Sequence, residues 1–256
     1  MKIELRRISS LILASTLIAS NPIFVYANEV AQSKAEASLE AQLQSDVQSI
    51  EDLLSTQGTN VSAELNSAIQ RMKNDQLTST SQEDRDKLQA LIDATQQLSI
   101  DYENYSNNTV QRGISHPVLT PAVAAVASYF SASGYLLSFE LLVHAQDNNI
   151  QYSTYTPYYG SRILSSSVVQ KIKQKQQDDT NSAVFEKTGS TVEQDLYYAI
   201  HKFNYSFVRS TGKFTLTDTY DFDYGDYEGI ANAAIDTMWQ AQIIGVLVPY
   251  YVKIIV

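Results

Sequence analysis

The sequence contains no cysteine. Without cysteine there is no disulfide to stabilise the fold, no thiol nucleophile and no acceptor for a lipoprotein anchor. Histidine is also scarce, with three residues in the chain. The nucleophile elbow Gly-x-Ser-x-Gly, the P-loop and the glycine-rich dinucleotide fingerprint are all missing. These absences exclude the reaction classes that those short motifs identify. Without disulfides, the apolar core alone must stabilise the fold.

Basic residues are also fewer than acidic residues. The formal net charge is −10. Residues 1–27 carry Lys2, Arg6 and Arg7 against Glu4, so the remainder of the chain carries −12. A surface this acidic repels phosphate backbones and anionic lipid, which argues against nucleic-acid binding and simple membrane adsorption.

Residues 1–27 have the three parts of a secretory signal. A basic start is followed by an apolar run at residues 8–20 and by the small-x-small pattern Val25-Tyr26-Ala27. The run is shorter than the roughly 20 residues that a bilayer span needs, which favours a cleaved signal over an uncleaved anchor. We therefore predict a secreted, extracellular protein that begins at Asn28. A cysteine-free exported chain is typical of Gram-positive bacteria.

Residues 28–109 are predicted to be helical. They are rich in Ala, Gln, Ser and acidic residues, and Tyr102 is their first aromatic residue. Apolar residues recur at steps of three and four over residues 31–55, 62–75 and 83–105, with Thr80 and Glu83 as a capping box for the last stretch. The narrow stripe favours a helical hairpin or a short coiled coil over partial disorder. The pattern leaves open whether this segment packs on the rest of the chain.

Residues 110–256 are predicted to form a compact α+β domain. Residues 118–145 read as two buried core helices separated at Gly134, with Pro121 in the first turn; a membrane-inserting hairpin is the alternative. Residues 163–175 are expected to form a helix, and residues 195–203 a helix or a strand. The polar loop at residues 147–160 is rich in tyrosines, which suit ordinary packing or the binding of carbohydrate or protein.

The clearest strand covers residues 214–222, where apolar and polar residues alternate. A helix capped by Asp226 is expected to run to Ile244. Residues 246–256 are apolar on both faces and predict a well-covered terminal strand, although Pro249 argues against a central position.

Asp218 is the most informative residue of the clearest strand. It lies on the apolar face, between Leu216 and Tyr220. A buried carboxylate is costly unless it is paired or hydrogen-bonded, so Asp218 is either a structural acceptor of loop amides or part of a functional site. Asp221 joins it on the same face only if the strand ends or bulges between them.

The other candidate residues are acidic side chains and histidines. Asp218, Asp221, Asp223 and Asp226 form an acidic run, and Asp221 and His144 are candidate ligands for a divalent metal. Glu140 and His144 are four residues apart, so they share one helix face, but zinc requires a third ligand. His201 or His144 is a candidate general base, and a structural histidine is the alternative for each.

The segment from Asp218 through Tyr220 and Asp221 resembles the Asp-x-Tyr-Asp motif of the colicin M family. This resemblance implies metal-assisted hydrolysis of the lipid-linked peptidoglycan precursor lipid II, with Asp218, Tyr220 and Asp221 at the site. The family continues with a His-Arg pair where this sequence has Tyr227 and Glu228. Residues 195–252 also resemble C-terminal modules of uncharacterised secreted Gram-positive proteins, which implies export.

Two functional hypotheses follow, and the sequence does not decide whether the protein is an enzyme. In the first, the helical segment displays an α+β domain that binds a protein or another cell-envelope or host component. In the second, the chain is a secreted envelope hydrolase or toxin with Asp218, Tyr220, Asp221 and His201 as its catalytic set. The second hypothesis requires a histidine and both aspartates to line one cleft.

Overall fold

The computed structural model describes residues 45, 48–107, 116–146, 153–187, 189–222, 230–243 and 246–256. The predicted signal peptide and cleavage site therefore lie outside the described residues, as do Asp223, Asp226, Tyr227 and Glu228. Most of the predicted boundary near residue 110 also lies outside them.

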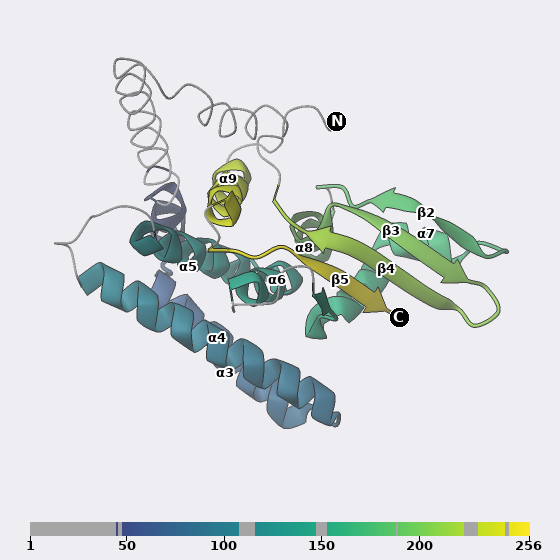
Figure 1. The fold of residues 1–256 in the computed structure, drawn as a ribbon, viewed down its shortest axis with the longest axis horizontal. Helices are drawn as coiled ribbons and strands as arrows, with labels where there is room; N and C mark the ends of the chain where they lie inside the picture. Colours follow the sequence, from purple (N-terminus) through teal and green to yellow (C-terminus); the bar gives the residue numbers. More distant parts are fainter. Residues whose placement is uncertain are drawn as a thin grey trace, which may run out of the picture. The chain divides into compact units, whose positions relative to one another are not determined.

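The first part of the described chain is helical, as predicted. Residues 48–56 are helical, α3 covers Val61–Thr78, and α4 covers Gln82–Asn107. The turn between α3 and α4 is short, so the two helices form an antiparallel hairpin (Figure 1). The capping box at Thr80 is wrong, because the Ser81 hydroxyl accepts the backbone N–H of Asp84 at 3.3 Å and α4 begins one residue later than that box requires.

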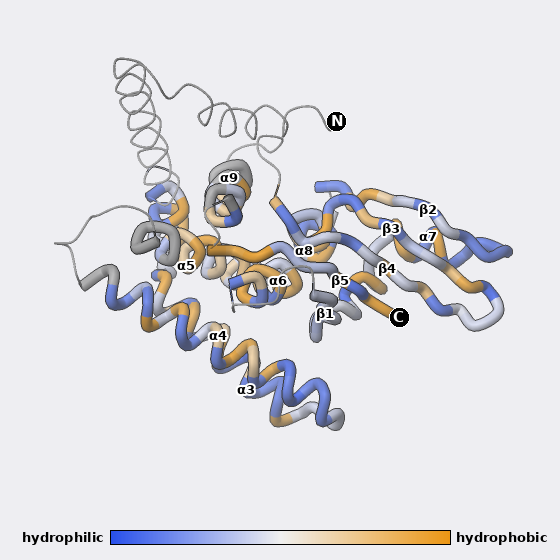
Figure 2. Tube along the Cα trace, viewed as in Figure 1, coloured by the Kyte–Doolittle hydropathy of each residue, from blue (hydrophilic) through white to orange (hydrophobic). Residues whose placement is uncertain are grey.

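The next two helices form the apolar centre of the fold. They are α5 (His116–Ala132) and α6 (Leu136–Gln146). The break at Gly134 is confirmed, with a φ of 74° that glycine adopts without strain. Pro121 does not lie in the first turn, because α5 already begins at His116. Figure 2 shows α6 as largely hydrophobic, whereas α3 and α4 alternate between hydrophilic and hydrophobic residues.

The hairpin packs on these central helices. Both α3 and α4 contact α5, and α4 also contacts α6. Leu65, Ile69, Leu88 and Ile92 from the hairpin stripe are buried. The segment therefore folds back on the domain, which the sequence left open. No helix among the described residues is both long and apolar enough to cross a membrane.

A five-stranded mixed sheet and further helices complete the α+β fold. The sheet order is β1-β5-β4-β3-β2, and only the β1–β5 pair is parallel. The elements run in the order β1 (Thr154–Tyr155), η1 (Tyr158–Ser165), α7 (Ser167–Lys173), β2 (Asp179–Val184), α8 (Thr191–Ile200), β3 (Lys202–Val208), β4 (Lys213–Tyr220), α9 (Ile230–Ile243) and β5 (Tyr250–Ile255).

Three element predictions need correction here. The helix expected over residues 163–175 is split into the 3-10 helix η1 and α7, because the Ser166 hydroxyl accepts the Val168 N–H and caps a new helix. The segment 195–203 is both helix and strand, since α8 gives way to β3 there. The terminal strand is covered on one face only, with Tyr251 and Ile255 exposed on the other, and Pro249 precedes it.

The covered face of the sheet builds the second half of the core. Alternate residues of β3, β4 and β5 are buried beneath η1, α7 and α8 (Figure 1), as period-two strands require: Phe203, Tyr205, Phe207, Phe214, Leu216, Tyr250, Val252 and Ile254. Asp218 pairs with Val252, so it occupies this same face, as the alternation predicted. It is the position at which the apolar face opens to a pocket.

Candidate functional site

One pocket gathers most of the predicted site residues at the end of β4. It has a volume of about 230 Å³, and we call it the Asp218 pocket. Its lining comes from the end of β4 and the residues after it, the α8–β3 junction and α9: Tyr198, Ala199, Ile200, His201, Lys202, Asp218, Thr219, Tyr220, Asp221, Phe222 and Ile235. A histidine and both aspartates therefore line one pocket, as the hydrolase hypothesis requires.

The sheet register explains why these residues meet. Strands β3 and β4 are antiparallel, and Asn204 pairs with Thr217. Continuing that register places the start of β3, with His201 and Lys202, opposite the end of β4. Because β4 ends at Tyr220, Asp221 is released from the strand alternation and lines the same pocket as Asp218.

The carboxyl group of Asp218 lies in an environment that disfavours its charge. Burial, with a smaller contribution from the nearby charge of Asp221, raises the pKa of Asp218 to about 8, although the hydrogen bond from the backbone N–H of Thr219 partly offsets the rise. Within the described part of the chain, no basic side chain forms an ion pair with Asp218. The raised pKa therefore favours the protonated form of Asp218 near neutral pH.

His201 occupies a strained backbone position in the lining of the Asp218 pocket. Its φ of 30° and ψ of −72° lie outside the regions that L-residues favour, and no other non-glycine residue in the described ranges has a positive φ. Two backbone bonds hold it there: its N–H donates to Tyr197 at 3.1 Å, and its carbonyl accepts the N–H of Phe185 at 2.7 Å. Its imidazole is exposed and stands edge-on to the ring of Tyr197.

We expect His201→Gly to be more stable than His201→Ala by about 1 kcal/mol, because glycine relieves the positive φ that alanine keeps. Both variants remove the imidazole, so the comparison isolates the backbone. Urea unfolding followed by circular dichroism measures the difference. Equal stability of the two variants would show that the backbone is unstrained.

Of the other two predicted site residues, Tyr220 lines the Asp218 pocket and His144 lies outside it. Tyr220 is 4% exposed, and its ring packs against Phe222 and Tyr250, so it forms a wall of the Asp218 pocket. Burial raises its phenol pKa well above the ordinary value, which disfavours a phenolate. His144 lines a different pocket with Tyr155, so it does not join Asp221.

The metal prediction gains no support from this geometry. Among the residues described, no group of three His, Asp or Glu side chains is placed to hold a metal ion. Glu140, the predicted neighbour of His144 in a metal pair, instead accepts hydrogen bonds from the Tyr155 hydroxyl at 2.6 Å and from the N–H groups of Tyr158 and Tyr159 at 2.6 and 2.7 Å. Two of the four members of the acidic run, Asp223 and Asp226, lie outside the described residues.

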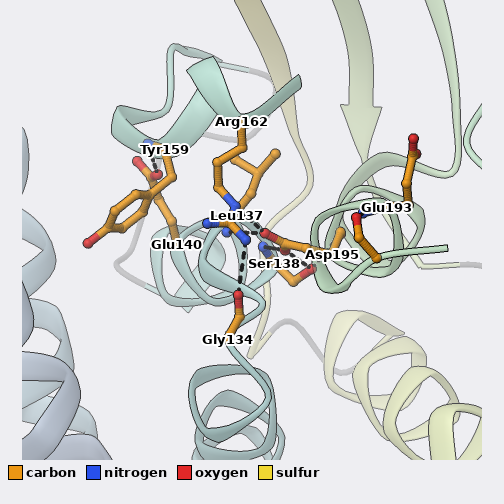
Figure 3. Close-up of polar contacts among 9 residues, drawn as sticks. Gly134, Leu137, Ser138, Glu140, Tyr159, Arg162, Glu193 and Asp195 are labelled. Carbon is orange, nitrogen blue, oxygen red and sulfur yellow. Dashed lines mark hydrogen bonds and ion pairs between the residues drawn. The ribbon is translucent and has the colours of Figure 1, made fainter. Parts of the chain in front are cut away.

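Sequence reasoning missed a buried network around Asp195 (Figure 3). The carboxylate accepts bonds from the N–H groups of Leu137 and Ser138 at 3.1 and 2.9 Å, from the Ser138 hydroxyl at 2.8 Å, and from Arg162 at 2.7 Å. Asp195 thus caps α6 from α8 and ties both helices to η1. The available signal was its place before Leu196, on the same helix face as Tyr198 and Ala199.

Comparisons with known proteins add nothing to this geometry, since no family model, curated protein or solved structure matches the chain.

Proposed function

We propose that the chain is a secreted hydrolase that acts on a cell-envelope component, with the Asp218 pocket as its active site. The observation that carries the proposal is the convergence of His201, Asp218 and Asp221 on one pocket. General acid–base catalysis usually relies on two titratable groups whose environments give them different pKa values, so that one donates a proton and the other accepts one.

The roles follow from burial and exposure. Asp218, held protonated by its surroundings, donates a proton to the leaving group. His201 is exposed at the pocket and takes a proton from the attacking water, because imidazole exchanges protons near neutral pH. Asp221, also exposed, orients that water or the imidazole. Lys202 supplies a positive charge at the same wall.

The volume of the Asp218 pocket and the net charge of the protein limit the range of substrates that fit. At about 230 Å³, the Asp218 pocket admits one ring or one amino-acid side chain of a larger polymer. The strong net negative charge disfavours a polyanionic substrate. A neutral or cationic unit of an envelope polymer suits both properties better than the diphosphate of a lipid-linked precursor.

The test is export of residues 28–256 to the periplasm of a Gram-negative host. We expect the natural chain to lyse the cells and both Asp218→Asn and His201→Ala to be harmless at equal periplasmic amounts, since loss of an acid–base group costs about 100-fold or more in rate. Growth, lysis and periplasmic protein are measured together. Asp93→Asn, an exposed change on α4, is the matched control that must still lyse.

Two results would contradict the hydrolase. One is harmless growth of the natural chain when it is folded in the periplasm; the other is lysis by Asp218→Asn and His201→Ala at the natural level. Harmless growth would favour the binding hypothesis, and a pull-down from envelope extracts with the natural chain is then the next step.

A further inference from the structure

A second pocket lies between α4 and the aromatic residues beside β1. Its volume is about 610 Å³, and we call it the α4 pocket. Leu91 and the small side chains of Ala90 and Ala94 form its α4 wall, while His144 and Tyr155 form the opposite wall. This size falls within the range of about 300–1,000 Å³ that is typical of small-molecule sites. None of its lining residues belongs to the Asp218 pocket.

The wall opposite α4 is a stacked pair of rings. The centroids of His144 and Tyr155 are 3.6 Å apart, and their planes differ by 14°. Tyr250 stands edge-on to both rings, at 4.7 Å from His144 and 5.9 Å from Tyr155. The pair is therefore held from the side as well as by its own stacking.

A buried carboxyl group fixes the position of the Tyr155 ring. Glu140 is 0% exposed, and its Oε1 accepts the Tyr155 hydroxyl at 2.6 Å. The N–H groups of Tyr158 and Tyr159 hold the same carboxyl group, so it cannot turn away from the phenol. Tyr155 thus enters the pocket wall already oriented, which lowers the entropic cost of binding a ligand.

The ring pair is uncharged at neutral pH. Burial lowers the pKa of His144 to about 4, and burial together with Glu140 raises that of Tyr155 well above its ordinary value. The part of the ring pair that lines the pocket therefore suits the apolar face of a ring and offers no full charge to an anion or a cation.

The rim of the pocket, in contrast, is polar. Lys87 and Glu83 form an ion pair at 2.8 Å, and the exposed Asp86 immediately precedes Lys87 on α4. These groups provide both donors and acceptors of hydrogen bonds. The two carboxylates outnumber the single ammonium group, so the rim disfavours phosphates and carboxylic acids.

We propose that the α4 pocket is a carbohydrate-binding site that stacks a pyranose ring on the Tyr155–His144 pair. A pyranose has one face of C–H groups, which suits the uncharged rings, and an edge of hydroxyl groups. Those hydroxyl groups both donate and accept hydrogen bonds, as the rim of Lys87, Glu83 and Asp86 requires. The site is separate from the Asp218 pocket and does not depend on the hydrolase proposal.

The test titrates the full chain with three soluble trisaccharides: maltotriose, cellotriose and chitotriose. Isothermal titration calorimetry and the amide NMR spectrum report binding. We expect at least one probe to bind in the millimolar range, and Ala90→Trp to weaken it by about tenfold or more. Ala90 is exposed, so tryptophan there fills the pocket without entering the core. Lys87→Met is expected to weaken binding by removing a rim donor.

Two matched controls make the result decisive. Gln96→Trp adds the same side chain at an exposed α4 position outside the pocket and must leave the affinity unchanged. Asp218→Asn must also bind normally, which separates this site from the proposed active site. The proposal is overturned if no trisaccharide binds the folded chain, or if binding survives Ala90→Trp.

Discussion

Replacement of Asp195 by alanine is expected to destabilise the protein by about 3–5 kcal/mol, which is the cost of breaking a buried ion pair from one side. Asp195 is 0% exposed, and all four groups that bond to its carboxyl are donors, so the site is built for the ionised form. Burial raises its pKa, and the donors, Arg162 included, offset that rise only in part. Alanine leaves the Arg162 charge and the first N–H groups of α6 without their acceptor (Figure 3).

Urea unfolding at pH 7, followed by circular dichroism, measures this loss. Glu83→Ala is the matched control, because Glu83 is also a carboxylate bonded to a basic side chain but is 76% exposed. Exposed ion pairs contribute little to stability, so this control should unfold close to the natural protein. A loss for Asp195→Ala as small as that of the control would show that the Asp195 network does not hold the helices together.

The second large effect is a gain in stability. We expect Asp218→Asn to make the protein more stable at pH 8 by about 2 kcal/mol, with the gain disappearing near pH 4. The folded state raises the pKa of Asp218 to about 8, so folding favours the protonated carboxyl group. The stability that this group contributes is complete below its unfolded pKa of about 4 and is lost as the pH rises through about 8. Asparagine stays neutral and avoids the loss.

The magnitude follows from the shift and from the exposure of the side chain. One pKa unit corresponds to about 1.4 kcal/mol. Because the Asp218 side chain is partly in contact with solvent, the expected gain in stability is smaller than the pKa shift multiplied by this value. Urea unfolding from pH 4 to pH 9 measures the difference between the two proteins. Thr217→Asn, an exposed change on the same strand, introduces no titrating group, and its effect should not vary with pH.

Asp218→Asn is expected to raise the stability of the protein and to abolish its lytic activity. A carboxyl group kept at an unfavourable position is typical of active sites, where activity is bought with stability. If Asp218→Asn shows no gain at any pH, the carboxyl group is well satisfied in the fold and its role is structural.

Several elements of the fold were predictable because their signals are local. The alternation over residues 214–222 predicted β4 and placed Asp218 on its buried face; the structure confirms the strand and the face, although β4 covers Lys213–Tyr220 and ends two residues earlier than predicted. The apolar stripe of the helical segment predicted α3 and α4, and Gly134 marked the break between α5 and α6. In each case the pattern of side chains along a few turns or one strand determines the element.

Two predictions were wrong because contacts outside the local segment decide the outcome. A capping box at Thr80 and a cap at Ser81 are nearly equal in local sequence, and the geometry of the α3–α4 turn decides between them. The apolar terminal segment predicted burial on both faces, yet Tyr251 and Ile255 are exposed because no layer covers that face of β5 within the described residues.

The sequence by itself determined the helical segment, the α+β class, the acidic surface and the anomaly at Asp218, since composition and periodicity are properties of neighbouring residues. The tertiary structure decided which residues meet. The β3–β4 register brings His201 into the same pocket as Asp218, and the end of β4 frees Asp221 to line that pocket as well. The packing of α6 against α8 and η1 gives Asp195 and Glu140 their donors. These contacts join residues far apart in the chain, and no local pattern encodes them because they exist only once the layers have packed.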